Sequence, residues 1–410
     1  MKVLIITYYW PPAGGSGVQR WLKFVKYLQE FGIEPIVYTV DNIIYPKEDI
    51  SLIEEVPSNI KVLKQPIWQP TDLFFWKKKK KTGVSNLSKG GFLSFIRGNF
   101  FIPDPKIFWV KKSVRFLQKF LNNNKIDVMH LIAEKLKKKN TVKWIADFRD
   151  TWSDLYYNKN FKQLFYARKK NKELENLVLK NADCILTVSN SLKEEFKKVA
   201  TNVKVITNGF DDEVKLNTLQ KLDEKFTISY IGLLPKQSNS KVFFNVLNKL
   251  CKENNQFKKD LKLHFIGDIS DEVQIEIKKN NLQLNSTFFG YVSHKKAIEF
   301  QQKSQVLLLL IPNVHKAEGI LTGKLFEYLA AKRPILAIGP KDGDLSKILQ
   351  ETKAGTVVDF NNEQQLTKEI KRLYKNYTLG NTSLKSIDIE KYHRKKLTSE
   401  LAKIIKSLTN

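Results

Sequence analysis

The residues best suited to chemistry in this sequence are a lysine and a glutamate three positions apart, Lys324 and Glu327. They lie in residues 322–331, TGKLFEYLAA, a pattern that predicts a helix opening at Gly323 after a polar residue. Side chains three apart on a helix project to neighbouring positions. A cation and a carboxylate near the start of a helix could bind a diphosphate and a ribose. The alternative is a surface ion pair that contributes only about 0.2–0.5 kcal/mol.

A second candidate is the glycine loop at residues 14–17, which lies between the first predicted strand and the first predicted helix. Backbone N–H groups and the positive end of the helix dipole can meet a phosphate there. Gly15 and Gly17 match the first two glycines of the dinucleotide fingerprint G-x-G-x-x-G, but its third position is Arg20. Asp41 lies near the end of the next predicted strand, so the loop alone leaves a nicotinamide-dependent enzyme open.

Apolar runs that alternate with helical patterns position these residues. Such alternation predicts doubly wound parallel sheets, and it occurs in two separate series. The strands of the first series are expected at residues 3–7, 36–40, 126–129, 144–147, 184–188 and 203–206. Those of the second series are expected at residues 226–231, 261–266, 287–289, 306–311, 334–338 and 355–358.

A turn cluster and a polar stretch at residues 208–225 separate the two series. We therefore predict a Rossmann-like domain over residues 1–207, a linker over 208–225 and a second Rossmann-like domain over 226–385. Residues 386–410 contain a predicted C-terminal helix. A chain of 410 residues is long enough for two cores.

Composition narrows the class of protein. The formal net charge of +28 attracts polyanions, although a compositionally biased genome would also add solvated lysines. No apolar run reaches the ~18–20 residues of a spanning helix, and the first apolar run is too short for a signal peptide, so we expect a cytoplasmic protein. Cys184 and Cys251 lack the spacing of a disulfide framework or zinc site, which predicts reduced, structural thiols.

Residues 70–113 do not fit the alternation. Aromatic residues 74–76 precede five lysines at 77–81, and further aromatic residues follow. Rings beside a lysine block are typical of the headgroup region of an anionic membrane, to which each basic residue adds about 1 kcal/mol. The alternative is a surface excursion that packs its rings inward.

Three segments together resemble a known family: residues 9–20 (YWPPAGGSGVQR), 144–152 (WIADFRDTW) and 323–336 (GKLFEYLAAKRPIL). They resemble the group 1 (family 4) retaining glycosyltransferases, and the likeness extends over nearly the whole chain. The resemblance implies a GT-B fold, with two Rossmann-like domains facing each other across a cleft. It assigns the acceptor to the first domain and the nucleotide sugar to the second, and it implies that the last helix crosses back to the first domain.

The resemblance also implies residue roles. In relatives the second glutamate of an E-x7-E motif binds the ribose, which matches Glu327, and the first-domain glycine loop approaches the donor diphosphate. We expect Lys324 and Lys236 to lie on the diphosphate. The predicted donor-binding residues are Gly14, Gly15, Lys236, Glu318, Gly323, Lys324 and Glu327.

Asp147 and Asp150, at the end of a first-domain strand, are candidates for the acceptor site and complete the predicted catalytic set with Lys324. In a retaining transfer the protein mainly positions the reactants and stabilises the departing diphosphate. The alternative role of both aspartates is capping and ion pairing with Arg149. We expect no cofactor and no metal, because relatives need none and the sequence shows no clustered His/Asp ligand set.

The sequence departs from the family in three places. Gly319 stands where the first glutamate of the motif is expected, with Glu318 one position away, and Ser238 stands where relatives carry an arginine. The strand at 126–129 runs directly into a helical pattern that begins at His130, without the usual active-site loop. His130 is a candidate displaced catalytic histidine or, alternatively, a structural residue in the first turn of that helix.

These features predict a transferase that moves a sugar from a nucleotide sugar to a lipid-linked or glycan acceptor, with retention, in cell-surface polysaccharide or glycolipid assembly. We expect it in the cytoplasm, with peripheral binding to the inner face of the plasma membrane. The alternatives are a non-catalytic relative that serves as a binding or scaffold subunit, and a nucleotide-sugar epimerase. A nucleic-acid partner is not expected, since no reading motif organises the basic residues.

Overall fold

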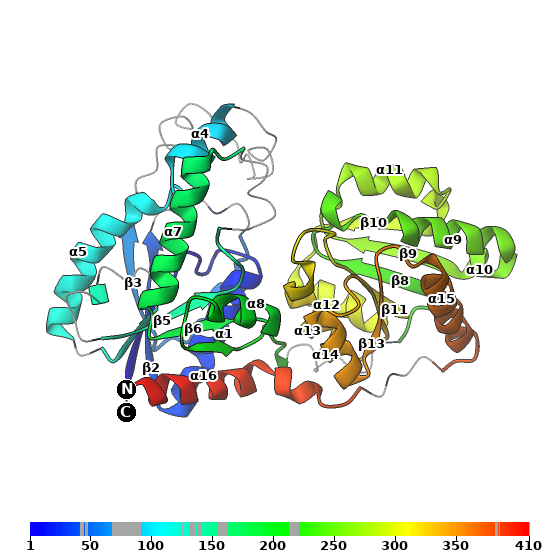
Figure 1. Ribbon diagram of the computed structural model, residues 1–410. Coiled ribbons are helices and arrows are strands. Elements are labelled where there is room, and N and C mark those ends of the chain that lie inside the picture. The colour runs from blue at the N-terminus through cyan, green and yellow to red at the C-terminus, as the bar shows by residue number, and fades with distance from the viewer. Residues whose placement is uncertain are drawn as a thin grey trace. The chain divides into compact units, whose positions relative to one another are not determined.

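The computed structural model describes residues 1–41, 45, 48–67, 92–124, 126–130, 136–137, 142–153, 162–212, 221–381, 384 and 386–409. The chain divides into two compact units. Unit 1 consists of Met1–Thr207 with Arg394–Asn410, and unit 2 of Asn208–His393. Each unit is an α/β layer structure around one parallel sheet (Figure 1).

Within the described residues, unit 1 contains a seven-stranded sheet in the order β3-β2-β1-β4-β5-β6-β7, and every pair is parallel. Each predicted strand is present with bounds shifted by one or two residues. β3 was not predicted, because its half-exposed sequence KVLKQP lies at the sheet edge and lacks an apolar run. The strands are β1 Lys2–Ile6, β2 Glu34–Asp41, β3 Lys61–Pro66, β4 Val128–His130, β5 Lys143–Phe148, β6 Cys184–Thr187 and β7 Val203–Val205.

Helices cover both faces of this sheet. α1 and α16 pack beside each other on one core, which includes Val25 and Leu401. The other core includes Trp109 of α5, Leu179 of α7 and Phe196 of α8. The helices are α1 Ser16–Leu28, α2 Ser51–Glu54, α4 Phe92–Phe100, α5 Ile107–Asn123, α7 Phe165–Asn181, α8 Asn190–Lys197 and α16 Arg394–Thr409, with the 3-10 turn η1 Gln29–Phe31.

Unit 2 contains, among its described residues, a six-stranded parallel sheet in the order β10-β9-β8-β11-β12-β13. Its strands coincide with the second predicted series, because five of them are apolar runs that are buried or nearly buried. They are β8 Phe226–Ile231, β9 Leu261–Ile266, β10 Ser286–Gly290, β11 Val306–Leu310, β12 Ile335–Ile338 and β13 Gly355–Val358.

Two cores lie on the two faces of the unit 2 sheet. Residues of α9, α11 and α15 form one core, and residues of α12, α13 and α14 form the other. The helices are α9 Lys241–Glu253, α10 Asn255–Asp260, α11 Asp271–Lys279, α12 His294–Lys303, α13 Gly323–Ala331, α14 Asp344–Thr352 and α15 Glu363–Thr378. The 3-10 turns are η5 Lys236–Ser238, η6 Gln283–Asn285, η7 Ala317–Gly319 and η8 Ile389–Tyr392.

One sequence prediction in unit 1 was wrong. His130 is the last residue of β4, paired with Ile5 and Ile145, and is not in the first turn of a helix. The strand continues because the pairing with β1 and β5 extends one residue beyond the apolar run. Most of the helical pattern predicted after it, residues 131–135, lies outside the described residues.

Other predictions agree with the fold. Cys184 and Cys251 are buried free thiols, and burial raises the pKa of Cys184 to about 12. Among the described residues, no helix combines the length and the apolar character that crossing a bilayer requires.

The packing of α16 predicts a stability effect. Leu401 is completely buried against α1, so Leu401→Ala should lower the free energy of unfolding of unit 1 by about 2–5 kcal/mol through lost burial and a cavity. Lys403→Ala on an exposed position of the same helix is the control and should change it by less than about 0.5 kcal/mol. Urea unfolding measures both, and equal effects would contradict the packing argument.

Candidate functional site

Three neighbouring strands of unit 2 end in glycines with left-handed backbone. Gly232, Gly267 and Gly290 follow or close β8, β9 and β10 with φ of 110°, 115° and 64°. A Cβ on Gly267 would lie 2.6 Å from the carbonyl oxygen of Gly232, so the chains approach more closely than a side chain permits. In open α/β sheets, ligands bind at this carboxyl edge of the strands.

Lys324 extends over this edge from the first turn of α13. The helix begins after Thr322, whose hydroxyl accepts from the Lys324 N–H at 3.1 Å. Lys324 Nζ donates to the Tyr230 hydroxyl at 2.6 Å and to the Leu233 carbonyl at 3.0 Å. A Cβ on Gly232 would lie 2.5 Å from Lys324 Cε. Position 232 therefore favours glycine for two reasons: the lysine side chain occupies the space of a Cβ, and the backbone there has a positive φ.

The charge of Lys324 is only partly compensated. Burial lowers the pKa of its ammonium to about 8, and the nearby Glu327 carboxylate opposes this shift. Both hydrogen bonds of the ammonium go to neutral oxygens, so the surface ion pair considered for Lys324 and Glu327 is not its main contact. A bound anion would supply the missing compensation, and perturbed groups of this kind mark functional sites.

Glu327 lies one turn further along α13 and is held from α12. Gln301 is completely buried and donates from Nε2 to Glu327 Oε2 at 3.0 Å. His294 Nε2 lies 3.4 Å from Glu327 Oε1. Tyr230, Gln301 and His294 were not predicted as site residues. The seven-residue spacing of His294 and Gln301, which puts them on one face of a helix, was an available signal.

The remaining donor-site predictions occupy nearby turns. Gly323 is the first residue of α13, as predicted, and Lys236 is exposed in the turn η5 after β8. Ser238, where relatives carry an arginine, is buried in that turn. Glu318 is exposed in η7. The structure brings Lys324 and Glu327 together on α13, while the roles of Lys236 and Glu318 stay predictions.

The glycine loop of unit 1 has the backbone conformation that its sequence requires. Gly15 has φ 108° and immediately precedes α1, and its carbonyl accepts from the Val18 and Gln19 N–H groups. A Cβ on Gly17 would lie 2.6 Å from Arg149 Nη1, so this glycine makes room for a guanidinium. Gly14 and Gly15 stay predicted phosphate contacts.

Asp147 takes part in a buried ion pair. Arg20 donates to both of its oxygens at 3.1 Å, and the Trp21 indole donates to Oδ2 at 3.0 Å. The side chains of Arg20 and Asp147 are each 2% exposed. The alternative considered from the sequence had paired the aspartates with Arg149. Asp150, which is exposed, and Asp147 stay catalytic predictions, although Asp147 acts as a structural anion in unit 1.

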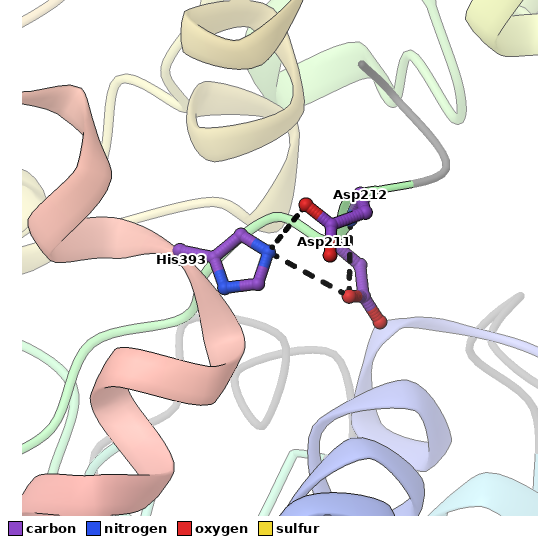
Figure 2. Close-up of side chains that lie close together, drawn as sticks. All are labelled: Asp211, Asp212 and His393. Atoms are coloured by element: carbon purple, nitrogen blue, oxygen red, sulfur yellow. Dashed lines mark hydrogen bonds and ion pairs between the residues drawn. The ribbon is translucent and has the colours of Figure 1, made fainter. Parts of the chain in front are cut away.

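Asp211, Asp212 and His393 form a cluster within unit 2 that was not predicted (Figure 2). Among the described residues it is the one group of three or more His, Cys, Asp or Glu residues whose ligand atoms all lie within 4.8 Å of one another, so the expectation that the chain has no clustered His/Asp set was wrong. Phe210 and His393 form a parallel bridge, which joins residues far apart in sequence. His393 Nε2 lies 3.1 Å from Asp212 Oδ1 and 3.9 Å from Asp211 Oδ1.

The buried ion pair of unit 1 predicts a stability change. Arg20→Met would leave the Asp147 carboxylate buried with the Trp21 indole as its donor, which should lower the free energy of unfolding by about 3–5 kcal/mol. The double variant Arg20→Met/Asp147→Leu removes both charges and should recover most of this loss. Denaturant unfolding tests both, and a neutral effect of Arg20→Met would contradict a structural role for the pair.

Replacing Lys324 should change the free energy of unfolding in the opposite direction. Lys324→Met removes a buried ammonium and leaves the Tyr230 hydroxyl bonded to the Leu233 carbonyl at 2.8 Å. The pKa of Lys324 is about 8 in the folded state against 10.5 ordinarily, so the unfolded state holds this proton more tightly and wild-type stability should rise between these two values. Lys324→Met should lose this rise and be more stable near pH 7, by up to about 3 kcal/mol. Urea unfolding at about pH 7 and about pH 10 measures the difference, and destabilisation near pH 7 would overturn the argument.

Residues 211–394 match the family described as Glycosyl transferases group 1. No curated protein matches the chain. HepE of Anabaena, solved with UDP and glucose, has 14% identity and a TM-score of 0.64, with 99% of this chain and 100% of that chain covered. Sucrose-phosphate synthase of Thermosynechococcus elongatus has 12% identity and a TM-score of 0.61, with 99% of this chain and 98% of that chain covered. A putative UDP-N-acetylglucosamine 2-epimerase from Listeria monocytogenes has 12% identity and a TM-score of 0.56, with 99% of this chain and 96% of that chain covered.

These likenesses cover nearly the whole chain at low identity, so they concern the fold. They agree with the two parallel-sheet units described above. The α/β GT-B fold predicted from the sequence is thereby confirmed, and the group 1 match falls on the unit that carries Lys324 and Glu327.

Proposed function

We propose that the protein is a glycosyltransferase that binds a nucleotide sugar at the carboxyl edge of the unit 2 sheet and transfers the sugar with retention of configuration. The observation that carries this proposal is the partly buried ammonium of Lys324 on the glycine edge, one turn from a carboxylate that Gln301 orients. These residues lie inside the segment that matches the group 1 family.

In this proposal Lys324 binds the diphosphate of the donor. The ammonium is fixed by Tyr230 and the Leu233 carbonyl, so it needs little reorganisation as charge develops on the departing diphosphate. The start of α13 adds the positive end of a helix dipole. Lys236, exposed on the neighbouring turn η5, would contribute a second cation without the bidentate geometry of an arginine.

Glu327 accepts from the ribose hydroxyls in the same proposal. Gln301 occupies Glu327 Oε2, and the buried amide fixes the plane of the carboxylate. Gln301 is thus a positioning residue for Glu327. Glu318 remains a proposed contact to the donor sugar. The reaction proposed here requires no cofactor and no metal.

Unit 1 provides the acceptor site in this proposal. Asp150 is exposed and available for that role, whereas Asp147 is already bound by Arg20 and Trp21. Gly14 and Gly15 are proposed contacts to the donor diphosphate. We propose a lipid-linked or glycan acceptor in cell-surface polysaccharide or glycolipid assembly. This part rests on the resemblance of the sequence to the family 4 enzymes.

Two alternatives use the same site. A non-catalytic scaffold or binding subunit is favoured by the absence of the arginine at Ser238 and of the first motif glutamate at Gly319. An epimerase is favoured by the structural likeness to the putative UDP-N-acetylglucosamine 2-epimerase. Both alternatives retain nucleotide-sugar binding and differ from a transferase in their products.

Binding of UDP-glucose, the ligand of one HepE structure, is the direct test of the donor site. Glu327→Ala and Lys324→Met should each weaken binding about 10–100-fold, because each removes a hydrogen bond to or from a charged group. Wild-type affinity should also fall above about pH 8, where Lys324 loses its charge, and this decline should be absent in Lys324→Met. Calorimetry measures all three effects.

The matched control for Glu327→Ala is Glu363→Ala, which removes an exposed carboxylate from α15 and should not change the affinity. If UDP-glucose does not bind, the same measurement is repeated with other nucleotide sugars. Equal affinity of both site variants and wild type for a nucleotide sugar that binds would overturn the proposed site. Product analysis then separates the functions: transfer to an acceptor identifies a transferase, isomerised sugar an epimerase, and neither product a binding subunit.

A further inference from the structure

The start of α7 and the end of α4 expose an unusual group of apolar side chains in unit 1. Phe165 is 75% exposed, Phe100 72%, Tyr166 70% and Leu164 53%. We call these four residues the α4–α7 aromatic patch. A soluble surface rarely collects several exposed rings, and such collections mark interaction sites.

Hydrogen bonds hold the two segments of the patch beside each other. The Leu164 N–H donates to Asn99 Oδ1 at 2.6 Å, and Gln163 Nε2 donates to the Gly98 carbonyl at 3.1 Å. Asn99 is buried, so this connection is shielded from water. The two segments that carry the exposed rings are therefore fixed to each other, and α4 lies beside the start of α7 (Figure 1).

Basic residues continue the patch along α7. One face of the helix carries Phe165, Arg168, Lys169 and Lys172 at positions i, i+3, i+4 and i+7. They line a surface hollow together with Glu173 and Asn176, and Lys172 Nζ lies 3.4 Å from Glu175 Oε2. Lys170 adds a further exposed cation, which lies 3.5 Å from Glu173. The first turn of the helix has no acidic residue, and Leu164 provides no side-chain cap.

This arrangement works against the stability of the helix. Cations near a helix N-terminus oppose the helix dipole, by about 0.3–1 kcal/mol for each residue in the first turn. Exposed rings likewise contribute nothing to the core. The opposite face of α7 follows the ordinary pattern, with Ala167, Asn171 and Glu175 buried. The unfavourable charges and exposed rings therefore lie only on the outward face of α7, where contact with a partner can offset their energetic cost.

We propose that the α4–α7 aromatic patch, with Arg168, Lys169 and Lys172, docks the protein on an anionic lipid bilayer. Charge complementarity identifies this occupant: the cations lie directly beside rings that fit the headgroup level, and each adds attraction to anionic lipid. The patch includes none of the lysines at residues 77–81 for which membrane binding was predicted; those lie outside the described residues. That the bilayer also holds the acceptor rests on the proposed function.

The test is co-sedimentation with vesicles of phosphatidylglycerol and phosphatidylcholine in equal parts, and with vesicles of phosphatidylcholine alone. Wild-type protein should bind the anionic vesicles at low salt and bind the neutral ones far more weakly. Arg168→Gln/Lys169→Gln should lower affinity about fivefold per charge, which corresponds to about 1 kcal/mol each. Phe165→Ala/Tyr166→Ala should lower it about tenfold per ring and remove the binding that survives high salt.

Two control variants in unit 2 match these changes. Lys278→Gln/Lys279→Gln removes the same charge from exposed positions of α11, and Leu284→Ala removes an exposed apolar side chain. Both should bind vesicles like wild type. Circular dichroism checks that every variant is folded. Equal losses in the controls, wild-type binding by the patch variants, or no binding of wild type to anionic vesicles at low salt would overturn the proposal.

The same variants separate this proposal from the proposed function. The patch variants should bind UDP-glucose with wild-type affinity, because the patch contains none of the proposed donor-binding residues. Loss of vesicle binding with intact nucleotide-sugar binding supports the patch. If wild-type protein binds no nucleotide sugar but still binds vesicles through the patch, the proposed function fails and the docking surface stands.

Discussion

The position of one partly buried ammonium group at the carboxyl edge of the unit 2 sheet constrains everything near it. Lys324 can lie there only because residue 232 is a glycine and because Tyr230 offers a hydroxyl and a ring, whose centroid is 4.3 Å from Nζ. The helix must also begin directly after Thr322 for the side chain to reach this edge. The end of β8, the glycine turn after it and the start of α13 thus position Lys324 together. A change in any of them would move its side chain.

In unit 1 a buried charge is neutralised by an opposite charge of the protein itself. The Asp147 carboxylate meets the two-pronged guanidinium of Arg20, and the charges cancel within the protein. Lys324 instead meets neutral oxygens, so its charge remains available to a ligand. This contrast explains why the lysine is the stronger candidate for a direct chemical role, although both residues lie near the carboxyl end of a strand.

The sequence predicted features that depend on local pattern. Apolar runs located the strands, and the three-residue spacing of Lys324 and Glu327 placed both on the first turns of one helix. β3 was missed because an edge strand needs no apolar run. Tyr230 and Gln301 could not be assigned, since their contacts with α13 depend on packing between distant segments. The same holds for the approach of Asp212 to His393, which follows from a strand bridge between residues 210 and 393.

The candidate sites depart from the ordinary rules of helix electrostatics and burial. A consistent sequence satisfies helix dipoles, buries rings and pairs buried charges, and exceptions are concentrated at functional sites. Lys324 breaks the rule on buried charge, and the outward face of α7 breaks those on dipoles and exposed rings. Asp211, Asp212 and His393 could ligate a metal by residue type, and they meet where two chain segments already pair. The bridge between residues 210 and 393 accounts for their proximity.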